Sequence, residues 1–131
     1  MALSIGIIDD DLVSQYATQY CIEQTLSESK VLVWDSGEEA LSQFIKFLQE
    51  GKPLPDILFL DLVMGGMNGW EFLEAIRPLT GKKQKTQIYI LSAFTNTKDR
   101  ELAKKHTMIK GYFDKPLSKS MMSSILVSQT L

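Results

Sequence analysis

The stretch LSIGIIDDD, residues 3–11, decides which fold this chain can adopt. Its first part is short, apolar and rich in β-branched residues, and it ends directly in three aspartates. A short continuous apolar run is typical of a strand that is buried on both faces of a sheet. The three aspartates then lie at the carboxyl end of that strand, which is where open α/β sheets bind their ligands.

Three later apolar runs also lead into a polar side chain. They are ILFL before Asp61, IYIL before Ser92 and IKGYF shortly before Lys115. If all these runs are parallel strands, their polar groups meet at one edge of one sheet. Clustered carboxylates bind Mg²⁺, and a lysine with a hydroxyl suits the oxygens of a phosphoryl group. The sequence therefore predicts a site that places a phosphoryl group on an aspartate.

Helical patterns separate the strands along the whole chain. Val13, Tyr16, Ala17, Tyr20 and Cys21 recur at helical spacing and predict the first helix. Further helices are predicted to begin near residues 36, 69, 97 and 118, which gives five β/α units. Right-handed crossovers, with acidic groups after strands 1 and 3, favour the strand order 2-1-3-4-5. We expect an α/β fold with one doubly wound, five-stranded parallel sheet.

Composition agrees with a single soluble domain over residues 1–131. Hydrophobic residues make up 44% of the chain and charged residues 23%, and the net charge is −2. This charge gives no electrostatic reason to expect nucleic-acid binding. Cys21 is the single cysteine and cannot form an internal disulfide, which favours a reducing compartment. No apolar run approaches the ~18 residues of a membrane span, so we expect a cytoplasmic protein with no membrane partner.

Five short motifs resemble the receiver domain of two-component response regulators. They are IIDDD at 7–11, FLDLVM at 59–64, MNG at 67–69, LSA at 91–93 and DKPL at 114–117. Each motif is weak by itself, but all five occur in order and at the correct spacing. The resemblance covers the chain from end to end, and it implies a flavodoxin-like fold and a stand-alone, chemotaxis-receiver-like domain or a receiver excised from a larger regulator.

The resemblance assigns a role to each residue of the predicted site. Asp61 would be the phosphoryl acceptor, and Ser92 and Lys115 would contact the phosphoryl oxygens. Asp9, Asp10 and Asp61 would hold Mg²⁺ together with the backbone carbonyl of Val63. Asp11 more simply caps the first helix. The turn that brings Lys115 back over the carboxylates predicts a cis peptide bond before Pro116.

The resemblance also implies a switch and its partners. A histidine kinase or phosphotransfer protein would donate the phosphoryl group, and Tyr112 would turn inward as Ser92 moves. The helix 4–strand 5–helix 5 face would then bind a downstream protein target or a second phosphorylated copy. The domain would catalyse only its own phosphorylation and dephosphorylation. Because Val63 and Phe94 cannot orient an attacking water, we expect slow dephosphorylation, measurable as decay of the label.

Two other functions fit parts of the sequence. Residues 9–13 match the Asp-x-Asp-x-Val motif of haloacid-dehalogenase-like phosphohydrolases, in which Asp9 would be the nucleophile. That interpretation leaves Asp61 without a role. The second alternative is a pseudo-receiver that binds partners without phosphorylation, and the complete set of Asp10, Asp61, Ser92 and Lys115 argues against it.

Overall fold

The computed structural model describes residues 2–80, 85–93 and 96–130, in which strands and helices alternate. The elements in chain order are β1 (Leu3–Ile8), α1 (Leu12–Thr25), β2 (Ser29–Trp34), α2 (Gly37–Gln49), β3 (Ile57–Leu60), α3 (Gly69–Ile76), β4 (Gln87–Ser92), α4 (Thr97–Lys105), β5 (Ile109–Asp114) and α5 (Lys119–Thr130). The sheet is parallel and has the order β2-β1-β3-β4-β5, which confirms the predicted fold.

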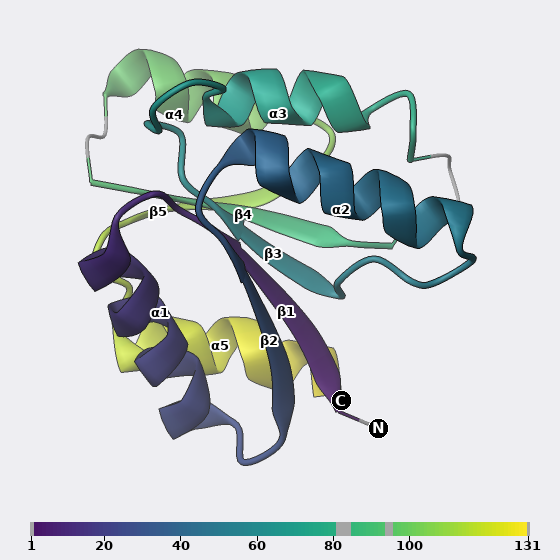
Figure 1. Ribbon diagram of the computed structural model, residues 1–131. Coiled ribbons are helices and arrows are strands. Elements are labelled where there is room, and N and C mark those ends of the chain that lie inside the picture. The colour runs from purple at the N-terminus through teal and green to yellow at the C-terminus, as the bar shows by residue number, and fades with distance from the viewer. Residues whose placement is uncertain (1, 81–84, 94–95, 131) are drawn as a thin grey trace.

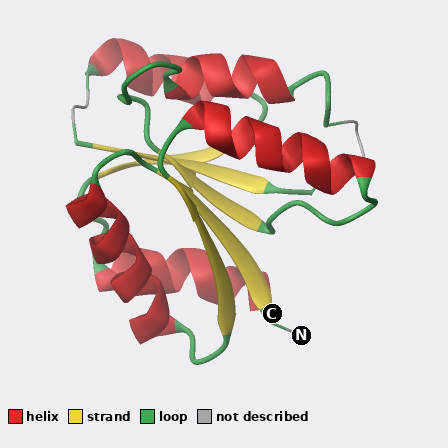
Figure 2. Ribbon diagram, in the orientation of Figure 1, coloured by secondary structure: helices red, strands yellow, loops and turns green. Residues whose placement is uncertain are grey.

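Helices cover both faces of the sheet. Figure 1 shows α1 and α5 on one face and α2, α3 and α4 on the other, and Figure 2 shows the sheet as the middle layer. This arrangement explains why β3 is buried along its whole length and reads as a continuous apolar run. Within the described ranges, no helix is long and apolar enough to cross a membrane.

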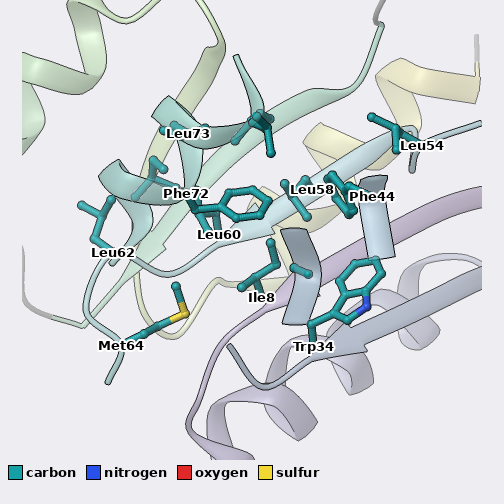
Figure 3. Close-up of a cluster of buried hydrophobic side chains, with 14 residues drawn as sticks. Ile8, Trp34, Phe44, Leu54, Leu58, Leu60, Leu62, Met64, Phe72 and Leu73 are labelled. Carbon is teal, nitrogen blue, oxygen red and sulfur yellow. The ribbon is translucent and has the colours of Figure 1, made fainter. Parts of the chain in front are cut away.

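Two hydrophobic clusters hold the three layers together. The cluster between the sheet and α2 and α3 is built around Phe44, whose ring meets Trp34 and Phe72 edge to face at 5.3 and 5.7 Å (Figure 3). Edge-to-face pairs add to the stabilisation from burial alone. The cluster on the other face includes Ile22 of α1 and Met122 of α5.

Polar caps set the starts of the helices. Asp11 accepts from the backbone N–H of Val13, as predicted for the cap of α1. Ser36 caps α2 in the same way by accepting from Glu39 N–H. Asn68 and Glu71 form a reciprocal capping box at the start of α3. Because Asn68 is the last residue of the loop between β3 and α3, this cap also fixes the end of that loop.

In the N-terminal part of α1, the exposed and buried faces are the reverse of what the apolar spacing suggests. Val13, Tyr16 and Tyr20 are 75%, 62% and 65% exposed, whereas Gln15 and Thr18 are buried beside the sheet. The helix forms where predicted, but Val13, Tyr16 and Tyr20 of its apolar stripe face away from the core, whereas Cys21 packs against it. Buried polar side chains need hydrogen-bond partners, so the contacts of α1 bear on function.

Candidate phosphoacceptor and metal site

Strand register brings the acceptor and its neighbours together. Ile8 of β1 pairs with Leu60 of β3, so the next residues, Asp9 and Asp61, leave the sheet side by side. Ser92 pairs with Asp114, and Lys115 is therefore the first residue beyond β5. Four polar groups that are far apart in the sequence thus share one edge of the sheet, as the sequence predicts.

Lys115 links two buried carboxylates. Its Nζ donates to Asp9 Oδ2 at 2.7 Å and to Asp61 Oδ2 at 3.1 Å. The side chains of Lys115, Asp9 and Asp61 are only 13%, 4% and 8% exposed, so solvent screens these contacts weakly. The Lys115–Pro116 peptide is cis, which confirms the prediction for this turn.

Asp10 completes a cluster of three carboxylates. Ligand atoms of Asp9, Asp10 and Asp61 all lie within 4.8 Å of one another. Asp10 is exposed, and its Oδ2 accepts from the backbone N–H of Gly65 at 3.0 Å. Carboxylate oxygens are the donors that Mg²⁺ prefers, and an exposed side leaves room for the waters that this ion retains. The residues present therefore fit the predicted ion.

The charges in the site perturb one another. Burial raises the pKa of Asp61, and the Asp9 carboxylate adds to this rise, while Lys115 opposes it. Burial alone would lower the pKa of Lys115, but its contacts with Asp9 and Asp61 have the larger combined effect, so this pKa is raised. The ammonium group therefore stays charged at neutral pH, and burial leaves the charged form of Asp61 at an energetic disadvantage.

The loop that follows β3, residues 61–68, is here called the acceptor loop, and it is held by packing on both sides of Val63. Leu62 and Met64 point into the core (Figure 3), which leaves Val63 54% exposed. The backbone N–H of Val63 donates to Asp61 Oδ1 at 3.3 Å. The metal-ligand role of its carbonyl stays a prediction, as does its effect on phosphoryl lifetime. Phe94, the other residue predicted to control water access, lies outside the described residues.

Gly69 explains how α3 can approach the acceptor so closely. A Cβ atom at this position would lie 2.7 Å from the carbonyl oxygen of Asp61 and 2.9 Å from Cα of Leu62. Both are backbone atoms that cannot move aside cheaply. Gly69 N–H donates to the Leu62 carbonyl at 3.0 Å. A residue without a side chain is therefore required for the first turn of α3 to pack against the acceptor loop.

Tyr112 is half-buried and lies near Ser92. The Tyr112 hydroxyl is buried, and among the described residues no partner meets hydrogen-bond geometry, although Ser92 is close enough to act on the pKa of Tyr112. The Arg100 guanidinium lies 5.1 Å above the Tyr112 ring and pairs with Asp114 at 2.6 Å. That Tyr112 turns inward as Ser92 moves stays a prediction.

Two residues of the site were missed from the sequence. Ser14 Oγ donates to Asp9 Oδ2 at 2.6 Å, and Gln15 Nε2 donates to the Asp9 backbone carbonyl at 2.6 Å. They lie in the first turns of α1, directly after the acidic run. The one available signal was the polar pair at 14–15 inside an otherwise apolar helix start.

The family model of the response regulator receiver domain matches residues 5–126. The chain belongs to this family. It is therefore a receiver domain of two-component signalling, a family that interacts with histidine kinases or phosphotransfer proteins. This membership favours the receiver interpretation over the haloacid-dehalogenase-like alternative, because the family model that matches the chain is that of the receiver domain.

Solved structures agree with the fold of this receiver domain. A two-component response regulator from Cytophaga hutchinsonii is 23% identical with a TM-score of 0.85, covering 98% of this chain and 97% of that chain. One from Legionella pneumophila is 26% identical with a TM-score of 0.80, covering 98% and 99%. A chemotaxis protein from Vibrio cholerae is 21% identical with a TM-score of 0.76, covering 98% of each chain. The comparison with curated protein sequences found no match.

Proposed function

We propose that this receiver domain accepts a phosphoryl group on Asp61, with Mg²⁺ bound by the acidic cluster, from the phosphohistidine of a histidine kinase or phosphotransfer protein in the cytoplasm. The P–N bond of the donor breaks as a P–O bond to the Asp61 carboxylate forms, and the imidazole keeps the bonding electron pair. The domain acts on itself and has no free substrate to turn over.

The contact of Lys115 with both Asp61 and Asp9 carries this proposal. An ammonium group 3.1 Å from the acceptor oxygen can move to a phosphoryl oxygen on the same side chain with little rearrangement. Ser92, fully buried at the end of β4, would supply a hydroxyl group to a second phosphoryl oxygen. Phosphoryl transfer needs positioning and charge neutralisation more than covalent chemistry, and these groups supply both.

Asp9, Asp10 and Asp61 would hold the Mg²⁺, with Asp10 on its solvent side. The ion would neutralise the charge that develops on the transferring oxygens. Burial raises the pKa of Asp61 most, and the ion would relieve the repulsion from Asp9 that adds to this rise. Lys115 is the cation that contacts this cluster in the described part of the chain, and the proposed function asks it to contact the phosphoryl group as well.

Labelling by acetyl phosphate tests this function directly. We expect wild-type protein to gain one phosphoryl group in Mg²⁺ and none in chelator. Asp10→Asn should slow labelling at least about tenfold, because losing one ligand charge raises the barrier by ~1.4 kcal/mol or more. Asp11→Asn is the matched control, since it removes a neighbouring charge and asparagine still caps α1. Equal slowing in both variants would contradict the assigned role of Asp10.

The exposed apolar stripe of α1 suggests where the phosphoryl donor docks. Val13, Tyr16 and Tyr20 form one face of the helix, and Leu12 adds to it at 57% exposure. A groove of about 270 Å³ beside this stripe runs from Val13 to Pro116 and Leu117 and includes Lys115. A partner helix seated here would reach Asp61, and its apolar contacts would cover the stripe.

A charge placed on this stripe should separate docking from chemistry. Val13→Glu should reduce phosphoryl transfer from a partner protein by at least about tenfold, because docking would desolvate the new carboxylate. Its labelling by acetyl phosphate should stay unchanged. Leu48→Glu on α2 is the control, since Leu48 is an exposed leucine of another helix. Docking at α1 would be contradicted if Val13→Glu lost labelling equally with the partner protein and with acetyl phosphate. It would also be contradicted if transfer from the partner protein were not reduced.

The face made by α4, β5 and α5 is the proposed output surface. Tyr112 and Arg100 link this face to Ser92 through the contacts described above, so a change at the acceptor has a direct route to it. A downstream protein, or a second phosphorylated copy of this chain, would bind there.

A further inference from the structure

The buried face of α1 is polar in its first two turns, where a core-facing helix is usually apolar, and becomes apolar at Ile22. Gln15 and Thr18 are 5% and 6% exposed and face the sheet. Burying polar groups costs free energy unless each finds a hydrogen-bond partner. Gln15 finds its partners at Asp9 and Asp35, so this polar side chain has a function beyond packing.

Asp9 is held from α1 at both its side chain and its backbone. Ser14 Oγ donates to Asp9 Oδ2 at 2.6 Å, and Gln15 Nε2 donates to the Asp9 carbonyl at 2.6 Å. The same Gln15 amide donates to Asp35 Oδ1 at 2.7 Å, which ties the end of β2 to the end of β1. Asp11 N–H supplies one more bond, to Asp9 Oδ1 at 3.0 Å.

Capping does not explain the Ser14 contact. Asp11 already caps α1, and Ser14 is the third residue of the helix rather than its cap. A serine inside a helix usually bonds to a backbone carbonyl one turn earlier. Here its hydroxyl reaches a carboxylate oxygen instead, and that oxygen also accepts from Lys115.

We propose that Ser14 is a positioning residue for the metal site, which holds the Asp9 carboxylate in its ligating orientation independently of Lys115. This inference rests on the proposed function, in which Lys115 turns toward the phosphoryl group and releases Asp9. Ser14 stands on a helix and stays in place through that step. Gln15 fixes the backbone of the same residue, so Asp9 keeps its position in both states.

Hydrogen bonds to ligating carboxylates commonly set metal affinity. Removing such a partner typically weakens binding ~10–100-fold. Without Ser14, Asp9 would be oriented by Lys115 and the Asp11 amide alone, and it would follow Lys115 when that side chain moves. The Asp9 carboxylate would then lose its ligating orientation at the step in which Mg²⁺ must stay bound.

Calorimetric titration with Mg²⁺ tests the proposal without measuring phosphorylation. We expect Ser14→Ala to weaken Mg²⁺ binding about tenfold relative to wild type. Ser14→Thr, which keeps the hydroxyl, should restore affinity to within about threefold of wild type. Thr18→Val is the matched control on the same buried face, because Thr18 does not bond to Asp9, and its Mg²⁺ affinity should equal that of wild type.

A second measurement on metal-free protein separates positioning from a general loss of packing. The backbone amide resonance of Asp11 reports on Asp9, because that N–H bonds to Asp9 Oδ1. It should shift in Ser14→Ala and stay in place in Thr18→Val. Equal Mg²⁺ affinity in Ser14→Ala and wild type would overturn the inference while leaving labelling of Asp61 intact. A wild-type protein that binds no Mg²⁺ would overturn the proposed function itself.

Discussion

Asp61→Asn should abolish labelling by acetyl phosphate or phosphoramidate. Asp61 is the aspartate at the end of β3, its Oδ2 contacts Lys115, and Ser92 lies at the end of the neighbouring strand. An asparagine amide cannot attack phosphorus as a carboxylate does. We therefore expect no acceptor at position 61 in this variant. The measurement is the mass of intact protein after incubation with donor and Mg²⁺. Undiminished labelling of the variant would contradict the role of Asp61.

Loss of the fold would not explain that result. Burial raises the pKa of Asp61 above the ordinary value of 3.8, so the folded protein favours the neutral acid more than the unfolded chain does. The stability from this group is fully present below pH 3.8 and is lost as the pH rises through the folded pKa. At neutral pH and without metal, Asp61→Asn removes the free-energy cost of keeping a charged carboxylate buried at this position. It should unfold at an equal or higher temperature than wild type.

Lys115→Ala should have the largest effect on stability. It leaves two buried carboxylates, Asp9 and Asp61, without the ammonium that contacts both. Removing one partner of a buried ion pair typically costs ~3 kcal/mol or more. We expect a loss of this size in the free energy of unfolding at pH 7 without metal. It should be accompanied by loss of labelling, because the phosphoryl group loses its contact.

The dependence of the Lys115→Ala stability loss on pH and Mg²⁺ shows whether the loss comes from the charge of Lys115 or from its packing. The pKa of Lys115 is raised above 10.5, so its contribution is fully present below pH 10.5 and is lost as the pH rises through the folded pKa. In acid the deficit of Lys115→Ala should shrink as Asp61, with its raised pKa, becomes protonated. Mg²⁺ should stabilise the variant more than wild type. Denaturant unfolding at pH 7 and 4.5 with and without Mg²⁺ measures this, and a constant deficit would contradict it.

The sheet and the strand-end residues could be predicted because each rests on a local pattern. Apolar runs that end in Asp9, Asp61 and Ser92 mark buried strands, and parallel register places their next residues at one edge. The cis peptide before Pro116 follows from the same requirement, that Lys115 returns over the carboxylates. These features need only the chain's own periodicity and the chemistry of its end groups.

The orientation of α1 could not be predicted in the same way. Apolar spacing shows that one side of a helix is hydrophobic, but it does not say whether that side meets the core or a partner. Here hydrogen bonds to Asp9 turn Ser14 and Gln15 inward and leave Val13 and Tyr16 exposed. The Tyr112 ring contacts Arg100, which belongs to another element, and no local pattern reveals such a contact.

The residue that binds beryllofluoride in the presence of Mg²⁺ tests the central claim most directly. This complex mimics a phosphoryl group on a carboxylate. Nuclear magnetic resonance of wild type, Asp61→Asn and Asp9→Asn would locate it, with the Val63 amide as a reporter because it donates to Asp61 Oδ1. We predict an adduct on Asp61 that shifts the Val63 amide in wild type and is absent from Asp61→Asn. An adduct that persists in Asp61→Asn and disappears in Asp9→Asn would contradict this account and identify Asp9 as the reactive carboxylate.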